Sequence, residues 1–163
     1  MWPRGGMVTQ RIANPFIPVR FWAWPPNNIL MDKKILKIAL NTKNLSFLDN
    51  HTHYTSLKNS TCGDLIKIYL LVRNKRIINF KYQCESCVYS QASASLLSRA
   101  VKNMKISDAK VFLNNAKYLF DKNKIRSKKK LNSFQKIMNK SNILRKDCLL
   151  LPFKATLKAL NNK

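Results

Sequence analysis

Alternating apolar and polar residues in the middle of the chain predict a β-hairpin. Residues 65–72 read LIKIYLLV, and the positions expected on one face are Ile66, Ile68, Leu70 and Val72. A second run covers Arg76–Tyr82, and the positions expected on one face are Ile78, Phe80 and Tyr82. Asn74 and Lys75 lie between the runs, at the spacing of a tight turn between antiparallel strands. A third strand is predicted near His53–Lys58.

Helical spacing of apolar residues precedes and follows this hairpin. The segment MDKKILKIALNTKN has the apolar positions Ile35, Leu36, Ile38 and Leu40. After Cys87, the segment SQASASLLSRAVKN is rich in Ala and Leu, and a helix there brings to one side Ala92, Leu96 and Ala100. Ser107 and Asp108 are suited to cap a further helix over DAKVFLNNAKYLF.

The C-terminal part predicts two more helices, over LNSFQKIMNK and LLLPFKATLKAL, after a solvated basic loop, DKNKIRSKKK. Proline is tolerated in the first turn of a helix, so the last helix is expected to begin close to Cys148 with Pro152 in that turn. One helix, then strands, then several helices predict an α+β fold. We expect a small antiparallel three-stranded sheet covered by about four to five helices.

The composition fits one globular domain with a large positive charge. The 163 residues are 45% hydrophobic, and the formal net charge is +24. The chain has 23 lysines, 8 arginines and 18 asparagines, a combination that indicates genome-wide nucleotide bias. Nucleic-acid binders favour arginine and aromatic stacking, so nucleic acid is not the expected partner, and a basic RNA-binding protein stays as an alternative. No apolar run reaches the roughly 20 residues that span a bilayer, so no membrane association is expected.

Residues 1–30 differ from the rest of the chain. They contain no lysine and no acidic residue, and they hold all three tryptophans and five of the six prolines. The composition changes abruptly at Met31. Two interpretations stand: a disordered extension, or an upstream mis-start with translation beginning at Met31, which the break at a methionine favours. Residues 31–163 are then the folded domain.

The four cysteines do not resemble a disulfide framework, because that pattern belongs to small secreted chains and the N-terminal residues lack the order of a signal peptide. A cytoplasmic location is therefore expected, where clustered thiols more often bind metal or react than form disulfides.

Three of these cysteines lie at predicted junctions between elements. Cys62 ends a loop before the first hairpin strand, Cys87 separates a strand from a helix, and Cys148 lies just before the last helix. A helix N-terminus favours the thiolate, which is the form that binds metal. Asp64 falls on the same side as Cys62 in an extended strand, with Gly63 between them. Three thiolates and a carboxylate suit tetrahedral Zn²⁺, and they could equally hold iron with one exchangeable oxygen ligand.

The pair Cys84 and Cys87 permits two other interpretations. A zinc ribbon needs a second C-x-x-C, which the chain does not have. A thioredoxin-type site needs a parallel βαβ context, which is not predicted here, and it would leave Cys62 and Cys148 unexplained.

Three blocks together resemble the NifU/IscU/SufU family of iron–sulfur cluster assembly scaffolds. They are NSTCGD at Cys62, CVYSQASAS at Cys87 and RKDC at Cys148, and the likeness extends over about residues 32–160. The resemblance implies a NifU/IscU-like fold and a carrier more than an enzyme. It implies a site made of Cys62, Asp64, Cys87 and Cys148, with Gly63, Arg145 and Lys146 in support. A transient [2Fe-2S] cluster or iron would be bound there, with zinc as the alternative.

The same resemblance implies partners and sulfur chemistry. A cysteine desulfurase would donate sulfur, with Cys87 and Cys148 as acceptor candidates, and apo iron–sulfur proteins or carrier proteins would receive the cluster. Arg145 or Lys146 would stabilise negative charge on a thiolate or persulfide. His51 and His53 are not expected as ligands because the set of four is complete. Ser90, Ser93 and Ser95 could turn hydroxyls or helix N–H groups toward the site, but helix capping and packing is the simpler expectation.

Departures from the family pattern favour the SufU branch, whose members bind zinc and accept sulfur from a desulfurase. Asp147 stands where the IscU branch has histidine, and sixty residues separate Cys87 from Cys148. Two other departures do not favour this branch: Ser60 replaces the proline of the first block, and CES stands where SufU proteins themselves have Gly-x-Gly. Cys84 is then an extra thiol and not a family ligand.

Overall fold

The computed structural model describes residues 33–120 and 132–162. The N-terminal segment 1–30 and the basic segment 121–130, on which the sequence made predictions, lie outside the described residues. Within the described part, no helix is both long and apolar enough to cross a membrane.

The predicted strands form one antiparallel sheet in the order β1-β2-β3. Its strands are β1 (His53–Lys58), β2 (Leu65–Arg73) and β3 (Arg76–Glu85). The turn between β2 and β3 has positive φ at both central residues, 50° at Asn74 and 56° at Lys75. Left-handed backbone at both positions defines the type I′ turn, whose twist matches that of the two strands. The hairpin and the strand at His53–Lys58 are confirmed.

One predicted face of the hairpin is wrong by one residue. Ile77 is fully buried and Ile78 is 39% exposed, although the alternation predicted Ile78 on the core side. The cause is a register shift: Leu71 pairs with Asn79 but Val72 pairs with Ile77, so Ile78 is left without an opposite residue. Such a bulge reverses the alternation on one side of it, and this is not visible in the apolar pattern.

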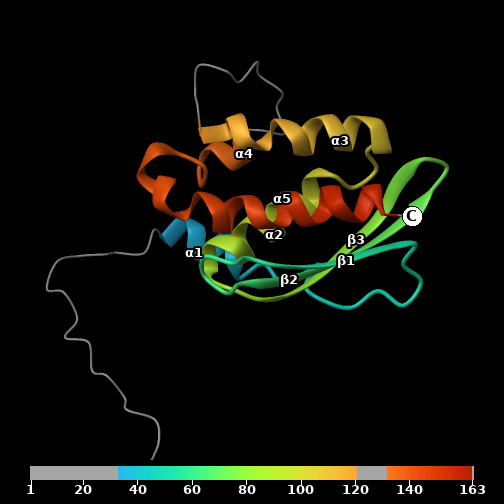
Figure 1. Cartoon of the computed structure of the whole chain (residues 1–163), viewed down its shortest axis with the longest axis horizontal. Coiled ribbons are helices and arrows are strands. Elements are labelled where there is room, and N and C mark those ends of the chain that lie inside the picture. Colours follow the sequence, from blue (N-terminus) through green and yellow to red (C-terminus); the bar gives the residue numbers. More distant parts are fainter. Residues whose placement is uncertain (1–32, 121–131, 163) are drawn as a thin grey trace, which may run out of the picture.

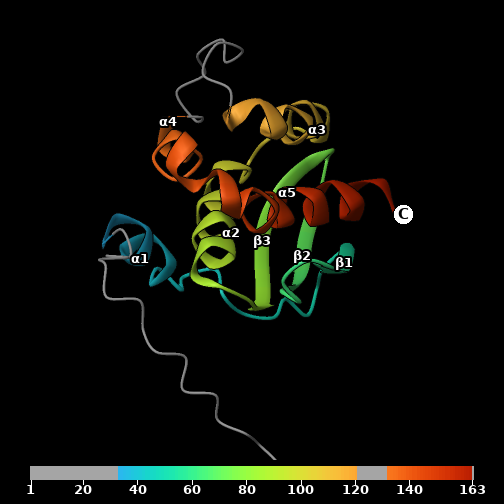
Figure 2. The same cartoon turned by 60° about the vertical axis from the view of Figure 1, so that its left-hand side comes forward.

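Helices cover one face of the sheet in two layers (Figures 1 and 2). The first helix of the described part, α1 (Lys33–Ala39), packs against α2 (Val88–Ala100). Helix α2 lies against β3, and α5 (Lys146–Asn161) lies against β1 and β2. The outer layer consists of α3 (Ile106–Asn114), η1 (Asn115–Phe120), α4 (Asn132–Gln135) and η4 (Lys140–Arg145). The predicted α+β class and three-stranded sheet are confirmed.

Helix α3 begins earlier than the capping residues predicted. Its N-cap is Lys105, which makes no side-chain capping bond, and Ser107 and Asp108 lie inside the first turn. The hairpin turn takes the place of the cap, because the carbonyl of Lys75 accepts from the N–H of Ile106 at 2.9 Å. A tertiary contact of this kind satisfies a helix terminus without a sequence signature.

The predicted helix over LNSFQKIMNK is short and is followed by a 3-10 segment. Helix α4 ends at Gln135, and Asn139 then caps η4 by accepting from the N–H of Asn142. Asparagine competes in this way with regular helical bonds, which explains the interruption.

Pro152 is the seventh residue of α5, not a residue of its first turn as predicted. Its ring nitrogen carries no hydrogen, so the carbonyl of Cys148, four residues earlier, has no α-helical partner. The hydroxyl Oγ of Ser90 in α2 lies 3.0 Å from this carbonyl oxygen. The neighbouring helix therefore supplies the donor that the proline lacks.

We predict that Lys75→Gly raises the free energy of unfolding by about 0.5–1 kcal/mol. A left-handed conformation costs roughly 1–2 kcal/mol in a non-glycine residue, and the greater freedom of glycine in the unfolded chain offsets part of the gain. Urea unfolding measures this. Lys102→Gly is the matched control, because Lys102 is also exposed but its φ is not positive. Equal effects of the two substitutions would contradict the prediction.

Candidate metal centre

The loop between β1 and β2 presents Cys62 and Asp64 from a closed turn. The backbone N–H of Asn59 donates to the Asp64 carbonyl at 2.7 Å, and the N–H of Gly63 donates to the Asn59 carbonyl at 2.9 Å. Gly63 has φ +76°, a left-handed conformation that glycine adopts without strain. The side-chain amide of Asn59 donates to Cys62 Sγ at 3.0 Å. Asn59 thus orients the thiol that follows it.

Cys87 and Cys148 come from two helices that pack against each other. Cys87 is the N-cap residue of α2, and Cys148 is the third residue of α5. Burial differs: Cys62 is exposed, Cys87 is half-buried and Cys148 is only 5% exposed. Their placement at element junctions follows the sequence prediction, except that Cys148 lies inside its helix and not before it.

Three of the four predicted ligands converge. One ligand atom from each of Cys62, Asp64 and Cys148 lies within 4.8 Å of the other two, although 86 positions separate the two cysteines. The Sγ atoms of Cys62 and Cys148 are 3.6 Å apart. Two sulfurs and a carboxylate oxygen at this spacing are a donor set that Zn²⁺ or iron can accept.

Cys87 is adjacent to this group without being one of the three. Its backbone N–H donates to Asp64 Oδ1 at 3.1 Å, and its Sγ lies 3.7 Å from Ser90 Oγ. It also affects the titration of both Asp64 and Cys148. Cys87 therefore borders the group through its backbone and through Ser90.

Asp64 is held as a buried carboxylate. It is 7% exposed, and Ser90 donates its hydroxyl to Asp64 Oδ2 at 2.6 Å. Burial alone would raise the pKa of Asp64, but hydrogen bonds with Ser90, Cys87 and Cys62 outweigh burial and lower the pKa below its usual 3.8. The group is ionised at neutral pH and can act as an anionic ligand.

The pKa of Cys148 shifts in the opposite direction, upward. Burial is the largest cause that raises the pKa of its thiol, and the neighbouring thiols Cys62 and Cys87 raise it further. In the metal-free protein it is a neutral thiol at physiological pH. A cation bound between these groups would reverse the balance, since metal coordination favours the thiolate.

Helix capping was expected of the serines of α2, but they do not cap this helix. The N-cap of α2 makes no side-chain capping bond. Ser90 instead contacts Asp64 and Cys148, Ser93 Oγ donates to the Leu149 carbonyl at 2.6 Å, and Ser95 Oγ donates to the Asn41 carbonyl at 3.1 Å. Packing was the correct half of that expectation. For Ser90 the structure shows the alternative that was not preferred, a hydroxyl turned toward the site. Asn59 is the residue that sequence reasoning missed, and its position three residues before Cys62 was the available signal.

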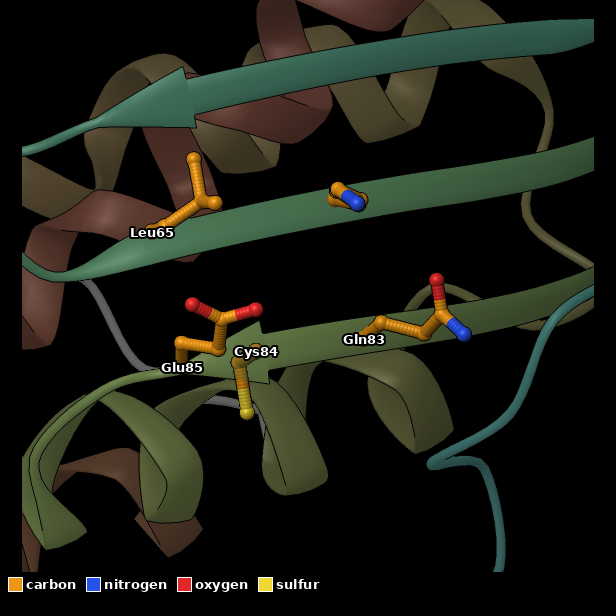
Figure 3. Close-up of a pocket in the computed structure, with 5 residues that line it drawn as sticks. Leu65, Gln83, Cys84 and Glu85 are labelled. Carbon is orange, nitrogen blue, oxygen red and sulfur yellow. The ribbon is translucent and has the colours of Figure 1, made fainter.

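Cys84 is separate from the three converging ligands. It pairs with Ile66 in the sheet, is half-buried and packs against the core. Figure 3 shows its sulfur on the opposite side of β3 from the side chains of Gln83 and Glu85. Burial is the largest cause that raises the pKa of its thiol. These features fit the predicted role of an extra, packing thiol.

The two supporting cations lie next to the start of α5. The guanidinium carbon of Arg145 lies 5.7 Å from the ring centre of Tyr89, and Lys146 Nζ lies 5.9 Å from that of Phe120. The contact between Arg145 and Tyr89 packs η4 against α2, two residues after Cys87. Asp147 forms an exposed ion pair with Lys154 at 3.2 Å. His51 packs against Phe47, Tyr54 and Tyr69.

This fold and ligand set define a class of small α+β proteins with thiols at element junctions. A family model, the NifU-like N terminal domain, matches residues 30–136, and the chain belongs to this family. The match includes Cys62, Asp64 and Cys87 but ends before Cys148. The fold itself brings Cys148 to Cys62.

Relatives and solved structures agree with this family. The iron–sulfur cluster assembly scaffold protein IscU of Thermotoga maritima is 29% identical over 104 residues, 61% of this chain and 73% of that protein. IscU 1 of Archaeoglobus fulgidus is also 29% identical, over 47% of this chain and only 50% of that protein.

Among solved structures, FiSufU of Fervidobacterium islandicum AW-1, assigned as a SUF-system scaffold, has a TM-score of 0.70 and 24% identity, covering 77% of this chain and 93% of that one. A NifU-like N-terminal protein of Brucella abortus has a TM-score of 0.70 and 20% identity, covering 80% of this chain and 91% of that one. These structures support the fold.

We predict that iodoacetamide modifies Cys62 at least about tenfold faster than Cys148 in metal-free protein near neutral pH. Cys62 is exposed, whereas Cys148 is buried and its raised pKa leaves little thiolate, the reactive form. The rate at Cys148 should rise with pH. Peptide mass spectrometry gives each rate, and urea-unfolded protein is the control in which the difference disappears. Equal rates in the folded protein would refute the assigned environments.

We predict that Cys84→Ser changes Zn²⁺ affinity by less than about twofold. The matched substitution Cys148→Ser should weaken binding by about tenfold or more, because even outer-shell changes at metal sites cost 10- to 100-fold. Chelator competition measures both. A large loss in Cys84→Ser would show that Cys84 is a ligand.

Proposed function

We propose that this protein is an iron–sulfur cluster assembly scaffold that builds a transient [2Fe-2S] cluster and transfers it to apo-proteins. The observation that carries the proposal is the convergence of Cys62, Asp64 and Cys148 with Cys87 beside them. Membership of the NifU-like family and likeness to proteins named as IscU scaffolds support it.

The residues suit an exchangeable cargo. Sulfur ligands bind iron and zinc well, and a single carboxylate among them is the more readily exchanged ligand. Cys62 is exposed, so a partner can reach the site from its side, while the groups at Asp64 and Cys148 are fixed within the fold. The protein would act as a carrier and not as an enzyme.

Sulfur would come from a cysteine desulfurase carrying a persulfide. A thiolate of this chain attacks the terminal sulfur, the donor's S–S bond breaks, and the donor leaves as a thiolate, so no oxidant is needed. Cys87 and Cys148 are the candidate acceptors, and the burial of Cys148 favours Cys87 as the first. Conversion of the transferred sulfur to sulfide needs two electrons from a reductant, a thiol or a reduced electron-transfer protein. Arg145 and Lys146, adjacent in sequence to the Cys148 segment, would stabilise negative charge on the acceptor.

A zinc-dependent sulfur-transfer partner of a desulfurase is the second candidate. It is favoured by the buried, ionised Asp64 beside two thiols, a set suited to tetrahedral zinc. In this function the same thiols would relay sulfur without holding a cluster.

We predict that anaerobic reconstitution with iron and sulfide gives a coloured protein with equal amounts of iron and acid-labile sulfide. Cys87→Ala should lose the cluster absorption, because it removes a thiolate ligand, and Cys84→Ser is the matched control that should keep it. Metal and acid-labile sulfide analysis of protein purified without oxygen is the measurement.

Two outcomes would replace this proposal. One tightly bound zinc with no sulfide would favour the zinc-dependent sulfur-transfer function. If the triple Cys→Ala variant at 62, 87 and 148 kept every activity, and RNA binding fell steeply with salt, a basic RNA-binding function would replace both.

A further inference from the structure

The carbonyl of Cys148 is unusual because its own helix does not satisfy it. Pro152 removes the α-helical donor that would reach this oxygen, deep in a helix that is otherwise regular. A buried carbonyl without a donor costs free energy, so a substitute donor is expected. The substitute is Ser90 Oγ, at 3.0 Å.

The Ser90 hydroxyl has one proton to donate and two neighbouring groups that can accept it. Its Oγ lies 2.6 Å from Asp64 Oδ2 and 3.0 Å from the Cys148 carbonyl, and its side chain is fully buried. The third neighbour is Cys87 Sγ at 3.7 Å. Its S–H can donate to the Ser90 oxygen only while the Ser90 proton points to another acceptor. The two acceptors therefore share this proton, and the charged, closer Asp64 takes the larger share in the metal-free protein.

We propose that Ser90 is a positioning residue whose hydroxyl turns from the Asp64 carboxylate to the Cys148 carbonyl when Asp64 binds a metal ion. The proposal rests on the proposed metal-binding function. Pro152 favours the exchange, because it removes the α-helical N–H that would compete with Ser90 for this carbonyl.

The exchange lowers the cost of using Asp64 as a ligand. A carboxylate oxygen that binds a cation gives up part of its strength as an acceptor, and a buried hydroxyl without an acceptor would be penalised. The Cys148 carbonyl prevents this penalty. Because Cys148 is itself a candidate ligand, the same hydroxyl connects both ligands, one just before β2 and one in α5.

The test is a double-mutant cycle on Zn²⁺ affinity, measured by chelator competition with zinc alone. Pro152→Ala supplies an N–H that competes with Ser90 for the Cys148 carbonyl and weakens it as the second acceptor, so zinc affinity should fall by about two- to tenfold. In the Ser90→Ala background the same substitution should have no effect. An equal loss in both backgrounds would assign Pro152 a purely structural role and overturn the proposal.

A second cycle on metal-free protein separates this proposal from the proposed function. In urea unfolding, Pro152→Ala should stabilise the Ser90→Ala background more than the wild type, because without Ser90 the carbonyl lacks a side-chain donor. If Pro152→Ala changes the free energy of unfolding equally in both backgrounds, Ser90 does not share its proton with the Cys148 carbonyl, whether or not metal binds. If this coupling is present but wild-type protein binds no zinc or iron, the proposed function fails and the exchange with it. Metal binding without coupling in affinity overturns the exchange alone.

Ser93→Ala is the matched control. Ser93 is also fully buried in α2 and donates to the next carbonyl of α5, that of Leu149, but it has no bond to Asp64. It should lower stability, but less than Ser90→Ala does, keep zinc affinity unchanged and leave the effect of Pro152→Ala intact. If Ser93→Ala removed the Pro152→Ala effect on zinc affinity, packing between helices would replace hydroxyl exchange as the explanation.

Discussion

The hydrogen bond between Ser90 and Asp64 is the contact on which the thiol site depends. It joins the sheet, where Asp64 precedes β2, to the first turn of α2, and Ser90 extends the connection to α5 through the Cys148 carbonyl. A buried carboxylate without such partners would cost several kcal/mol, roughly the range found when one partner of a buried charged pair is removed. The same bond therefore stabilises Asp64 and sets the distance between the elements that carry the cysteines.

The small residues of α2 follow from this constraint. Side chains of alanine and serine fill the buried face of α2 from Ser90 to Ser95, so α2 can approach the backbone of α5 closely. Serine hydroxyls are short, and Ser90 and Ser93 reach two successive carbonyls of α5 only because the helices are this close. The Ser-Ala-Ser segment is thus a packing requirement of the site as well as a family motif. A larger residue there would separate Cys87 from Cys148.

The sequence predicted the sheet, its hairpin and three residues that the structure brings together, Cys62, Asp64 and Cys148, from alternation, turn residues and the cysteine blocks. Prediction from the sequence failed where a contact between distant segments determines the local structure. The bulge at Ile78 reverses one face, the hairpin turn replaces the cap of α3, and the donor from Ser90 permits Pro152 inside α5. None of these partners can be identified from local sequence. The role of Asn59 was missed, and that of Ser90 was considered but not preferred, for the same reason, since each depends on which side chain lies opposite.

The burial of the ligands separates a fixed side of the site from an accessible one. Asp64 and Cys148 are buried and held by hydrogen bonds from α2, whereas Cys62 is exposed on a loop that Asn59 closes. A scaffold must hold its cargo and also release it, and these needs conflict if all ligands are equally rigid. Here the weakest ligand type, the carboxylate, is also the group with an alternative hydrogen-bond partner in Ser90. In the proposed scaffold function, release would begin at Asp64 without breaking the packing of α2 against α5, and the exposed thiol of Cys62 would keep contact with the cargo.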